Sequence, residues 1–185
     1  MKPKSEPRNP WNPFIDYLEK LVRRQDRGAL AALRRGVGKA PGAAMEMHPY
    51  VVPFLPSGRP WEEEFYYLVA SLFAYWHQGE SAVAAHPPDN LGASLARLKT
   101  PDTGPSLEAR FTALIKSHRE DLPVHLRQAV GLLKSKDVPV HWQHLWRDLR
   151  HWDREDGCVQ RAWAKSFWGV KTKTETEPTA NDQND

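Results

Sequence analysis

Three histidines and the only cysteine lie near one another in the C-terminal third of the chain, where they could bind a metal ion. His141 and His144 are three residues apart, so one helical face can carry both, and His151 and Cys158 follow at intervals of seven. Zinc accepts both ligand types. The segment nevertheless has neither a paired-cysteine spacing nor a His-Glu-x-x-His motif. We therefore interpret these histidines as surface or interface residues and predict no metal and no other cofactor.

Cys158 could instead act as a nucleophile with His151 as its base, because the two are seven residues apart on a possible helix. Against this, Gly157 and the charged residues 153–156 stand between them. A lone cysteine is also more often inert than reactive.

Sequence motifs of the common enzyme classes are absent. The chain has no P-loop, no dinucleotide-binding fingerprint and no Gly-x-Ser-x-Gly elbow. Glu62, Glu63 and Glu64 resemble acid–base machinery, but they stand where a helix begins, and the helix dipole favours carboxylates there. We predict a protein that is not an enzyme.

The net charge of +3 conceals an uneven distribution along the 185 residues. It is +6 over residues 1–60, −5 over 61–90, +4 over 91–136 and −2 over 137–185. Basic helical faces attract phosphate backbones with little regard to sequence. The alternative is that these lysines and arginines only solvate the outer faces of helices, as in most proteins.

The eight tryptophans can form a hydrophobic core or a stacking surface. Four of them lie on or near apolar stripes and are predicted to be core residues: Trp142, Trp152, Trp163 and Trp168. For Trp11 and Trp146, stacking on a base or on a partner protein remains open.

The elements that must position these residues are helices. The best-defined one opens at Pro60, where Ser57 can serve as its cap, and it buries a stripe from Phe65 to Trp76. Further helical patterns begin at residue 14, after the candidate cap Asp26, around 90–98, and from 106, 121, 142 and 159 onward. Residues 39–59 and 78–89 are predicted to be loops, and no segment shows the alternation of a sheet strand.

The fold class expected from this pattern is all-α, a helical bundle arranged as two small lobes. Residues 1–13 are predicted to form a flexible arm, 14–100 and 101–170 the two lobes, and 171–185 a disordered tail. The chain has no apolar run long enough for a bilayer, its N-terminus lacks the apolar stretch of a signal peptide, and Cys158 has no partner for an internal disulfide. We expect a cytoplasmic protein.

Four segments together carry a resemblance to a known family. They keep the order GALAALRRG (28–36), NLGASLARL (90–98), the long run 109–152 that starts ARFTALIK and ends LRHW, and VQRAWAKSFW (159–168). In this combination the chain resembles the CasB family, the small subunit of the type I-E CRISPR surveillance complex Cascade. The resemblance spans roughly residues 14–168, and its specificity lies in the order and spacing of motifs that are individually weak.

The resemblance implies a non-enzymatic, two-lobed helical protein. It implies as partners a second copy packed head to tail, the backbone and large subunits of Cascade, and the R-loop that guide RNA and target DNA form. We expect basic residues of the matched segments to contact nucleic acid: Arg34, Arg35, Arg97, Arg110, Lys116, Arg119, Arg127 and Lys134. Because Arg34 and Arg35 are adjacent, they project about 100° apart on a helix, so one can bind phosphate while the other pairs internally.

An alternative of a different class is a protein–protein scaffold that does not touch nucleic acid. Its basic faces would meet acidic subunits, and the acidic segment 61–90 could meet the basic face of a second copy.

Overall fold

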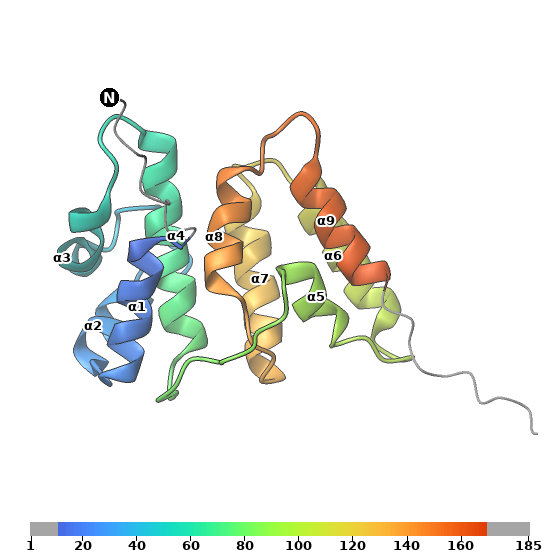
Figure 1. Cartoon of the computed structure of the whole chain (residues 1–185), viewed down its shortest axis with the longest axis horizontal. Helices are drawn as coiled ribbons and strands as arrows, with labels where there is room; N and C mark the ends of the chain where they lie inside the picture. The colour runs from blue at the N-terminus through green and yellow to red at the C-terminus, as the bar shows by residue number, and fades with distance from the viewer. Residues whose placement is uncertain (1–10, 170–185) are drawn as a thin grey trace, which may run out of the picture.

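The computed structural model describes residues 11–169 and contains only helices and connecting loops within them, which confirms the all-α prediction. Figure 1 shows their arrangement. The elements are α1 (Pro13–Arg23), α2 (Arg27–Arg34), η1 (Met45–Met47), α3 (His48–Val51), η2 (Val52–Phe54), α4 (Pro60–Trp76), α5 (Leu91–Ala96), α6 (Gly104–Lys116), α7 (Leu122–Ser135), α8 (Trp142–Arg150) and α9 (Cys158–Trp168). None of the helices in the described range combines the length and the apolar character that a membrane span requires.

Helix starts follow the sequence signals in one case and depart from them in another. The side chain of Asp26 accepts a hydrogen bond from the backbone of Ala29 at 3.0 Å, so the predicted cap of α2 is confirmed. The predicted cap of α4, Ser57, is wrong. That helix begins directly after Arg59, which makes no side-chain cap hydrogen bond, and Pro60 occupies its first turn, where a missing N–H breaks no hydrogen bond.

The prediction that residues 39–59 form a loop without elements is also wrong in part. Three short helical turns, η1, α3 and η2, occupy residues 45–54. Pro49 and Pro53 stand in the first turn of α3 and η2, where a missing N–H breaks no hydrogen bond. Prolines that exclude a long helix therefore fit a chain of single turns.

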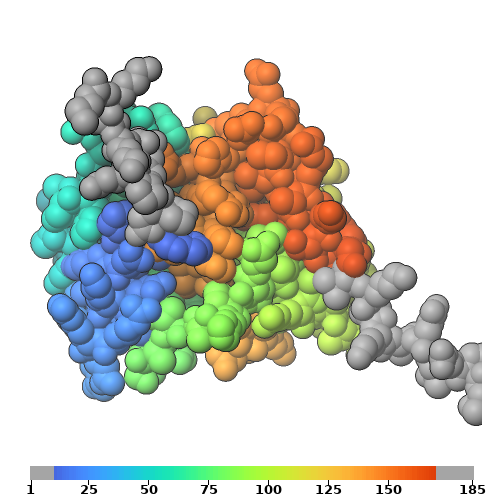
Figure 2. Space-filling model, viewed as in Figure 1, coloured from blue at the N-terminus to red at the C-terminus, as the bar shows by residue number. Residues whose placement is uncertain are grey.

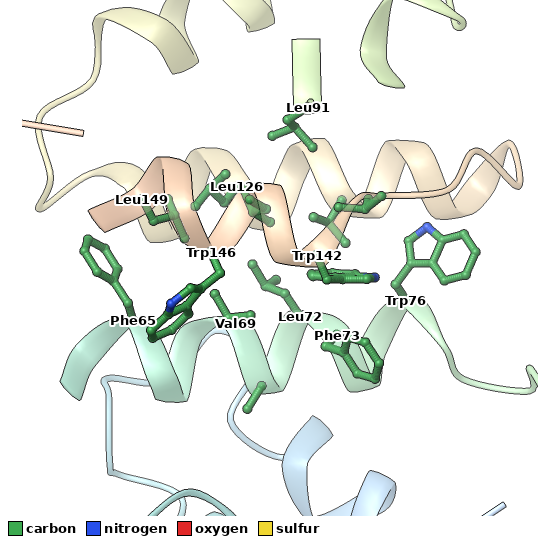
Figure 3. Close-up of a cluster of buried hydrophobic side chains, with 14 of the residues drawn as sticks. Phe65, Val69, Leu72, Phe73, Trp76, Leu91, Leu126, Trp142, Trp146 and Leu149 are labelled. Atoms are coloured by element: carbon green, nitrogen blue, oxygen red, sulfur yellow. The ribbon is translucent and has the colours of Figure 1, made fainter. Parts of the chain in front are cut away.

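The central contact of the core joins α4 to α8. In Figure 3, Trp142 and Trp146 of α8 point toward Phe65 and Phe73 of α4. Trp146 is 3% exposed, so the suggestion that it stacks on a base or a partner is wrong. A buried carboxylate of α4 also joins these helices, since Glu62 forms an ion pair with Arg150 of α8. It forms a second ion pair with Arg59.

The remaining tryptophans divide between core and surface. Trp142, Trp152 and Trp163 are buried, which confirms the prediction for them. Trp168 is 44% exposed, and its assignment to the core is wrong. As the last residue of α9 it reaches the core only at one edge, where its ring meets Phe111 with centroids 5.2 Å apart.

Helices α1–α4 lie at one end of the molecule and α5, α6 and α9 at the other, and α7 and α8 between them both pack against α4 (Figures 1 and 2). Helix α5 packs most closely on α9. This packing favours a boundary in the connection before residue 90, whereas the sequence places it near residue 100; the division into lobes stays a prediction. Residues 1–10 of the predicted arm and residues 170–185, which contain the predicted tail, lie outside the described residues. Asn12 also belongs to the predicted arm, and it caps α1 and hydrogen-bonds Gln143.

Candidate nucleic-acid interface

The predicted cationic residues do not share one surface, because α7 divides them. Arg127 and Lys134 are seven residues apart on α7, so both project from one side of this helix. His125 and Gln128 project from the opposite side, where they line a small hollow together with Arg110 of α6. The helix therefore has one side toward α2 and α4 and another toward α5 and α6.

We call the first side the α7 basic face and define it as Arg34, Lys39, Arg119, Arg127 and Lys134. Arg34 ends α2, and Lys39 lies in the turn that follows. Gly38 in this turn has a φ of +76° and lies against the Arg127 guanidinium, which a Cβ at that position would strike. A left-handed glycine thus brings the turn after α2 into contact with α7.

Lys134 is held by the end of α4. Its ammonium group donates a hydrogen bond to the carbonyl of Tyr75 and lies 4.8 Å from the centre of the Tyr75 ring. The pKa of Lys134 is lowered, mainly by burial and further by the charge of Arg34. The positive potentials of α2 and α7 therefore overlap at this point.

Arg119 is also fixed by internal contacts. Its guanidinium pairs with Asp153. It also lies over the rings of Trp61 and Phe65, at 4.7 and 5.1 Å from their centres. Such a cation stacked on aromatic rings is positioned before any ligand arrives.

Arg34 and Arg35 differ as their adjacent positions predict. Arg35 forms an ion pair with Glu46 at 2.6 Å, with both side chains well exposed. Arg34 makes no side-chain hydrogen bond or ion pair within residues 11–169. The internal pairing of one arginine is confirmed, and phosphate binding by the other stays a prediction.

A cavity of about 290 Å³ opens between the 36–42 turn, α4 and the start of α7. Its interior is mostly apolar and includes Phe65, Leu68 and Leu72, with the edge of Tyr67. Three cations of the α7 basic face line it, and within residues 11–169 Glu64 is its only carboxylate. The cavity thus combines an aromatic interior with positive charge.

The second side carries Arg97, Arg110 and Lys116. All three are exposed and have no side-chain partner among the described residues. The hollow beside Arg110 measures only about 20 Å³, little more than the space of one water molecule. These cations can attract phosphate, but the residues that the structure describes around them form no shaped site.

The histidines of the 141–151 segment have structural contacts. The rings of His141 and His144 stack with centroids 3.7 Å apart, and Trp11 stacks beside both. His141 caps α8, and His151 bonds to the carbonyl of Arg147 at 2.8 Å. Burial, and then the neighbouring His144, lowers the pKa of His141. In the described part of the chain, no three His, Cys, Asp or Glu residues come together as metal ligands would.

Sequence reasoning did not single out Lys39 or Trp61 for this surface. Lys39 follows Gly36 and Gly38, and this glycine-rich spacing after a basic helix end could have indicated a turn folded back against another element. Trp61 gave no such signal. It becomes part of the surface through Arg119, which lies 58 residues later in the sequence.

Comparison with known proteins gives consistent matches. The family model of the CRISPR-associated protein Cse2 matches residues 29–168. The CRISPR-associated protein Cse2 of Thermus thermophilus is 34% identical over 172 residues, which cover 90% of this chain and 95% of that protein. The crystal structure of a Cse2-family protein from Thermus thermophilus has a TM-score of 0.72 at 32% identity, covering 85% of this chain and 97% of that one. A chain of a CRISPR RNA-guided surveillance complex has a TM-score of 0.67 at 30% identity, with coverages of 84% and 89%.

Proposed function

This chain belongs to the family of CRISPR-associated proteins Cse2, also called CasB, and we propose that it is a non-catalytic subunit of a Cascade surveillance complex. In that role it binds nucleic acid without sequence specificity and stabilises the R-loop formed by guide RNA and target DNA. Its partners are the backbone and large subunits of Cascade and a second copy of itself. The similarity to a chain of a CRISPR RNA-guided surveillance complex supports this assignment.

The observation that carries the nucleic-acid part of the proposal is the number of uncommitted cations. Arg34, Arg97, Arg110, Lys116 and Arg127 have no side-chain hydrogen bond or ion pair within residues 11–169. A solvated surface arginine would often pair with a nearby carboxylate, as Arg35 does with Glu46.

Modest contacts are sufficient for such a role. Formation of an R-loop exchanges one duplex for another of similar stability, so a few phosphate contacts can tip the balance. Each phosphate that a lysine or arginine neutralises releases condensed counterions, which makes the binding strongly dependent on salt. Exposed arginines on helices can supply these contacts to either single strand without reading its bases.

Charge reversal tests the proposal. Replacing Arg34 or Arg127 singly by glutamate should weaken binding of single-stranded DNA about tenfold, and replacing Arg110 about threefold. Each change should reduce the salt slope by about 0.7, the value of one phosphate contact on a single strand. Binding is measured by filter retention at two salt concentrations. Arg154→Glu, an equal charge change at an exposed arginine that pairs with Asp156 at 2.8 Å, serves as the matched control and should have a smaller effect. Unchanged affinity and slope for all three variants would falsify the proposal.

The scaffold alternative depends on the acidic segment 61–90. The burial of Glu62 in ion pairs with Arg59 and Arg150 removes one of its five carboxylates from the surface. Co-purification of the variants with the other Cascade subunits distinguishes the two functions. Variants that lose DNA binding and still assemble favour direct nucleic-acid contact, whereas variants that lose assembly and retain DNA binding favour the scaffold.

A further inference from the structure

The 290 Å³ cavity beside the α7 basic face has an interior suited to a flat, partly apolar group. Phe65 and Tyr67 contribute aromatic carbon, and Leu68 and Leu72 contribute aliphatic carbon. The cavity lies close to the lower end of the size range of small-molecule sites in proteins. It is therefore large enough for a single nucleobase and too small for a longer segment of folded structure.

The rim of the cavity carries positive charge. Lys39 comes from the turn after α2, Arg119 from the loop before α7, and Arg127 from α7, with its guanidinium against Gly38 of that turn. Among the lining residues that the structure describes, Glu64 is the single carboxylate, so the three cations outweigh it. Arg119 is already fixed by Asp153 and the Trp61 ring, whereas Arg127 has no side-chain partner in the described part of the chain.

We propose that this cavity receives one unstacked base of a single-stranded nucleic acid whose phosphates lie on the α7 basic face. The inference rests on the proposed function and adds a subsite to it. Every base has an aromatic face, so this contact needs no particular sequence, and stacking on protein side chains stabilises bound single strands. Double-stranded DNA keeps its bases paired and stacked, so the cavity favours single strands.

Charge decides between this occupant and a protein side chain. An apolar side chain of another subunit could fill the interior, but it would need carboxylates around it to match three cations. A nucleotide carries its own phosphate next to the base and meets both parts of the site at once. The base then occupies the apolar interior while the phosphates face Lys39 and Arg127.

A comparison of two oligonucleotides with the unaltered full-length protein tests the inference directly. One is a thymidine strand of about 20 nucleotides, and the other is a strand of equal length and charge in which every nucleotide is abasic. We expect the thymidine strand to bind about tenfold more tightly, with equal salt slopes for the two strands. Equal affinity would overturn the inference while leaving the proposed phosphate contacts intact.

A variant that fills the cavity locates the effect. Ala40 is exposed and lines the cavity, and Ala43, three residues later in the same turn, is exposed and does not line it. Ala40→Leu should remove most of the preference for thymidine over the abasic strand and leave affinity for the abasic strand unchanged. Ala43→Leu, the matched control, should retain the preference. Thermal unfolding of both variants verifies that each is folded.

The outcomes separate this inference from the function on which it rests. Weaker binding of both strands by Arg127→Glu, together with loss of only the thymidine preference in Ala40→Leu, supports both proposals. A thymidine preference that persists in Ala40→Leu overturns the subsite alone. If Ala40→Leu leaves DNA binding unchanged and weakens assembly with other Cascade subunits, the cavity holds a protein side chain and the inference is wrong. If the unaltered protein binds neither the thymidine strand nor the abasic strand, both proposals are overturned.

Discussion

The two sides of α7 both carry basic residues, yet different forces hold them. On the α5–α6 side, mainly close packing and neutral hydrogen bonds fix the backbone, and one cation, Lys99, is held by Glu108 at 3.7 Å and by the ring of Phe167. Gly92 of α5 lies against the backbone of Trp163, and Ser94 donates a hydrogen bond to the carbonyl of Pro139 at 2.9 Å. On the α7 basic face, the charged groups are themselves part of the framework, since Lys134 binds the carbonyl of Tyr75 and Arg119 pairs with Asp153.

This difference separates attraction from positioning. Exposed cations without partners, such as Arg97 and Arg110, can follow a phosphate backbone but do not define where it lies. Cations held by carbonyls, carboxylates and aromatic rings lose little freedom when a ligand binds. We therefore expect the α5–α6 side to contribute general attraction and the α7 basic face to fix the position of the strand.

The largest expected effect tests the packing that holds the α5–α6 side. A Cβ at Gly92 would overlap the backbone carbonyl of Trp163. Because the overlapping atoms belong to the backbones of two packed helices, neither helix can move aside easily. Gly92→Ala should lower the free energy of unfolding by about 3 kcal/mol, measured by urea denaturation.

The matched control for that variant lies in the neighbouring helix. Gly104 begins α6 with open space around the position of a Cβ. Because its Cβ would meet only the ring of Pro105, which follows it, Gly104→Ala should lower the free energy of unfolding by less than about 1 kcal/mol. If Gly92→Ala proves as stable as Gly104→Ala, close α5–α9 packing does not hold this side.

The next effect concerns acid stability beside the α7 basic face. Burial lowers the pKa of His77 to about 4; the carbonyl of Phe73 opposes the shift and the charge of Lys134 adds to it. The unfolded chain takes up a proton at this histidine as the pH falls below 6.5, while the folded protein resists until about 4. The free energy of unfolding should therefore fall with pH in this window, by about 2 kcal/mol between pH 7 and pH 5.

Substitution isolates the contribution of this histidine. His77→Phe keeps an aromatic ring among Phe73, Trp76 and Trp142 and cannot take up a proton. Urea unfolding at pH 7, 6 and 5 should give a flatter pH dependence for His77→Phe than for the unaltered protein. His86→Phe, at an exposed loop position, should keep the original slope. Parallel curves for His77→Phe and the unaltered protein would contradict this prediction.

Periodicity and capping signals predict the helices well because they are local. Asp26 caps α2 through a contact three residues away, and the stripe of α4 repeats within one helix. Tryptophan burial was less predictable, because it depends on what another element covers. Trp146 meets Tyr66 and Phe14 from distant segments and is buried, whereas Trp168 stands at a helix end and is largely exposed.

The candidate site was predictable as a set of residue types and not as a surface. Sequence identified Arg127 and Arg110 alike, and only the structure places Arg127 of α7 at the cavity and Arg110 of α6 beside the hollow on the other side of α7. The cavity depends on Gly38, whose left-handed turn brings Lys39 toward α7. Such a contact between residues nearly 90 positions apart leaves no periodic signal in the chain.

The smallest expected effect compares the two sides by their binding. Replacing Arg34 and Arg127 together by alanine should weaken binding of single-stranded DNA about tenfold, because their potential adds to that of the fixed cations nearby. Replacing Arg97 and Arg110 together should weaken it about threefold. Each pair should lower the salt slope by about 1.4, as two lost phosphate contacts require.

Arg35→Ala, which removes a cation already paired, should change affinity less than about twofold. Equal losses for the two pairs would mean that fixed neighbours add nothing to positioning, and the basic residues would then act as one diffuse surface.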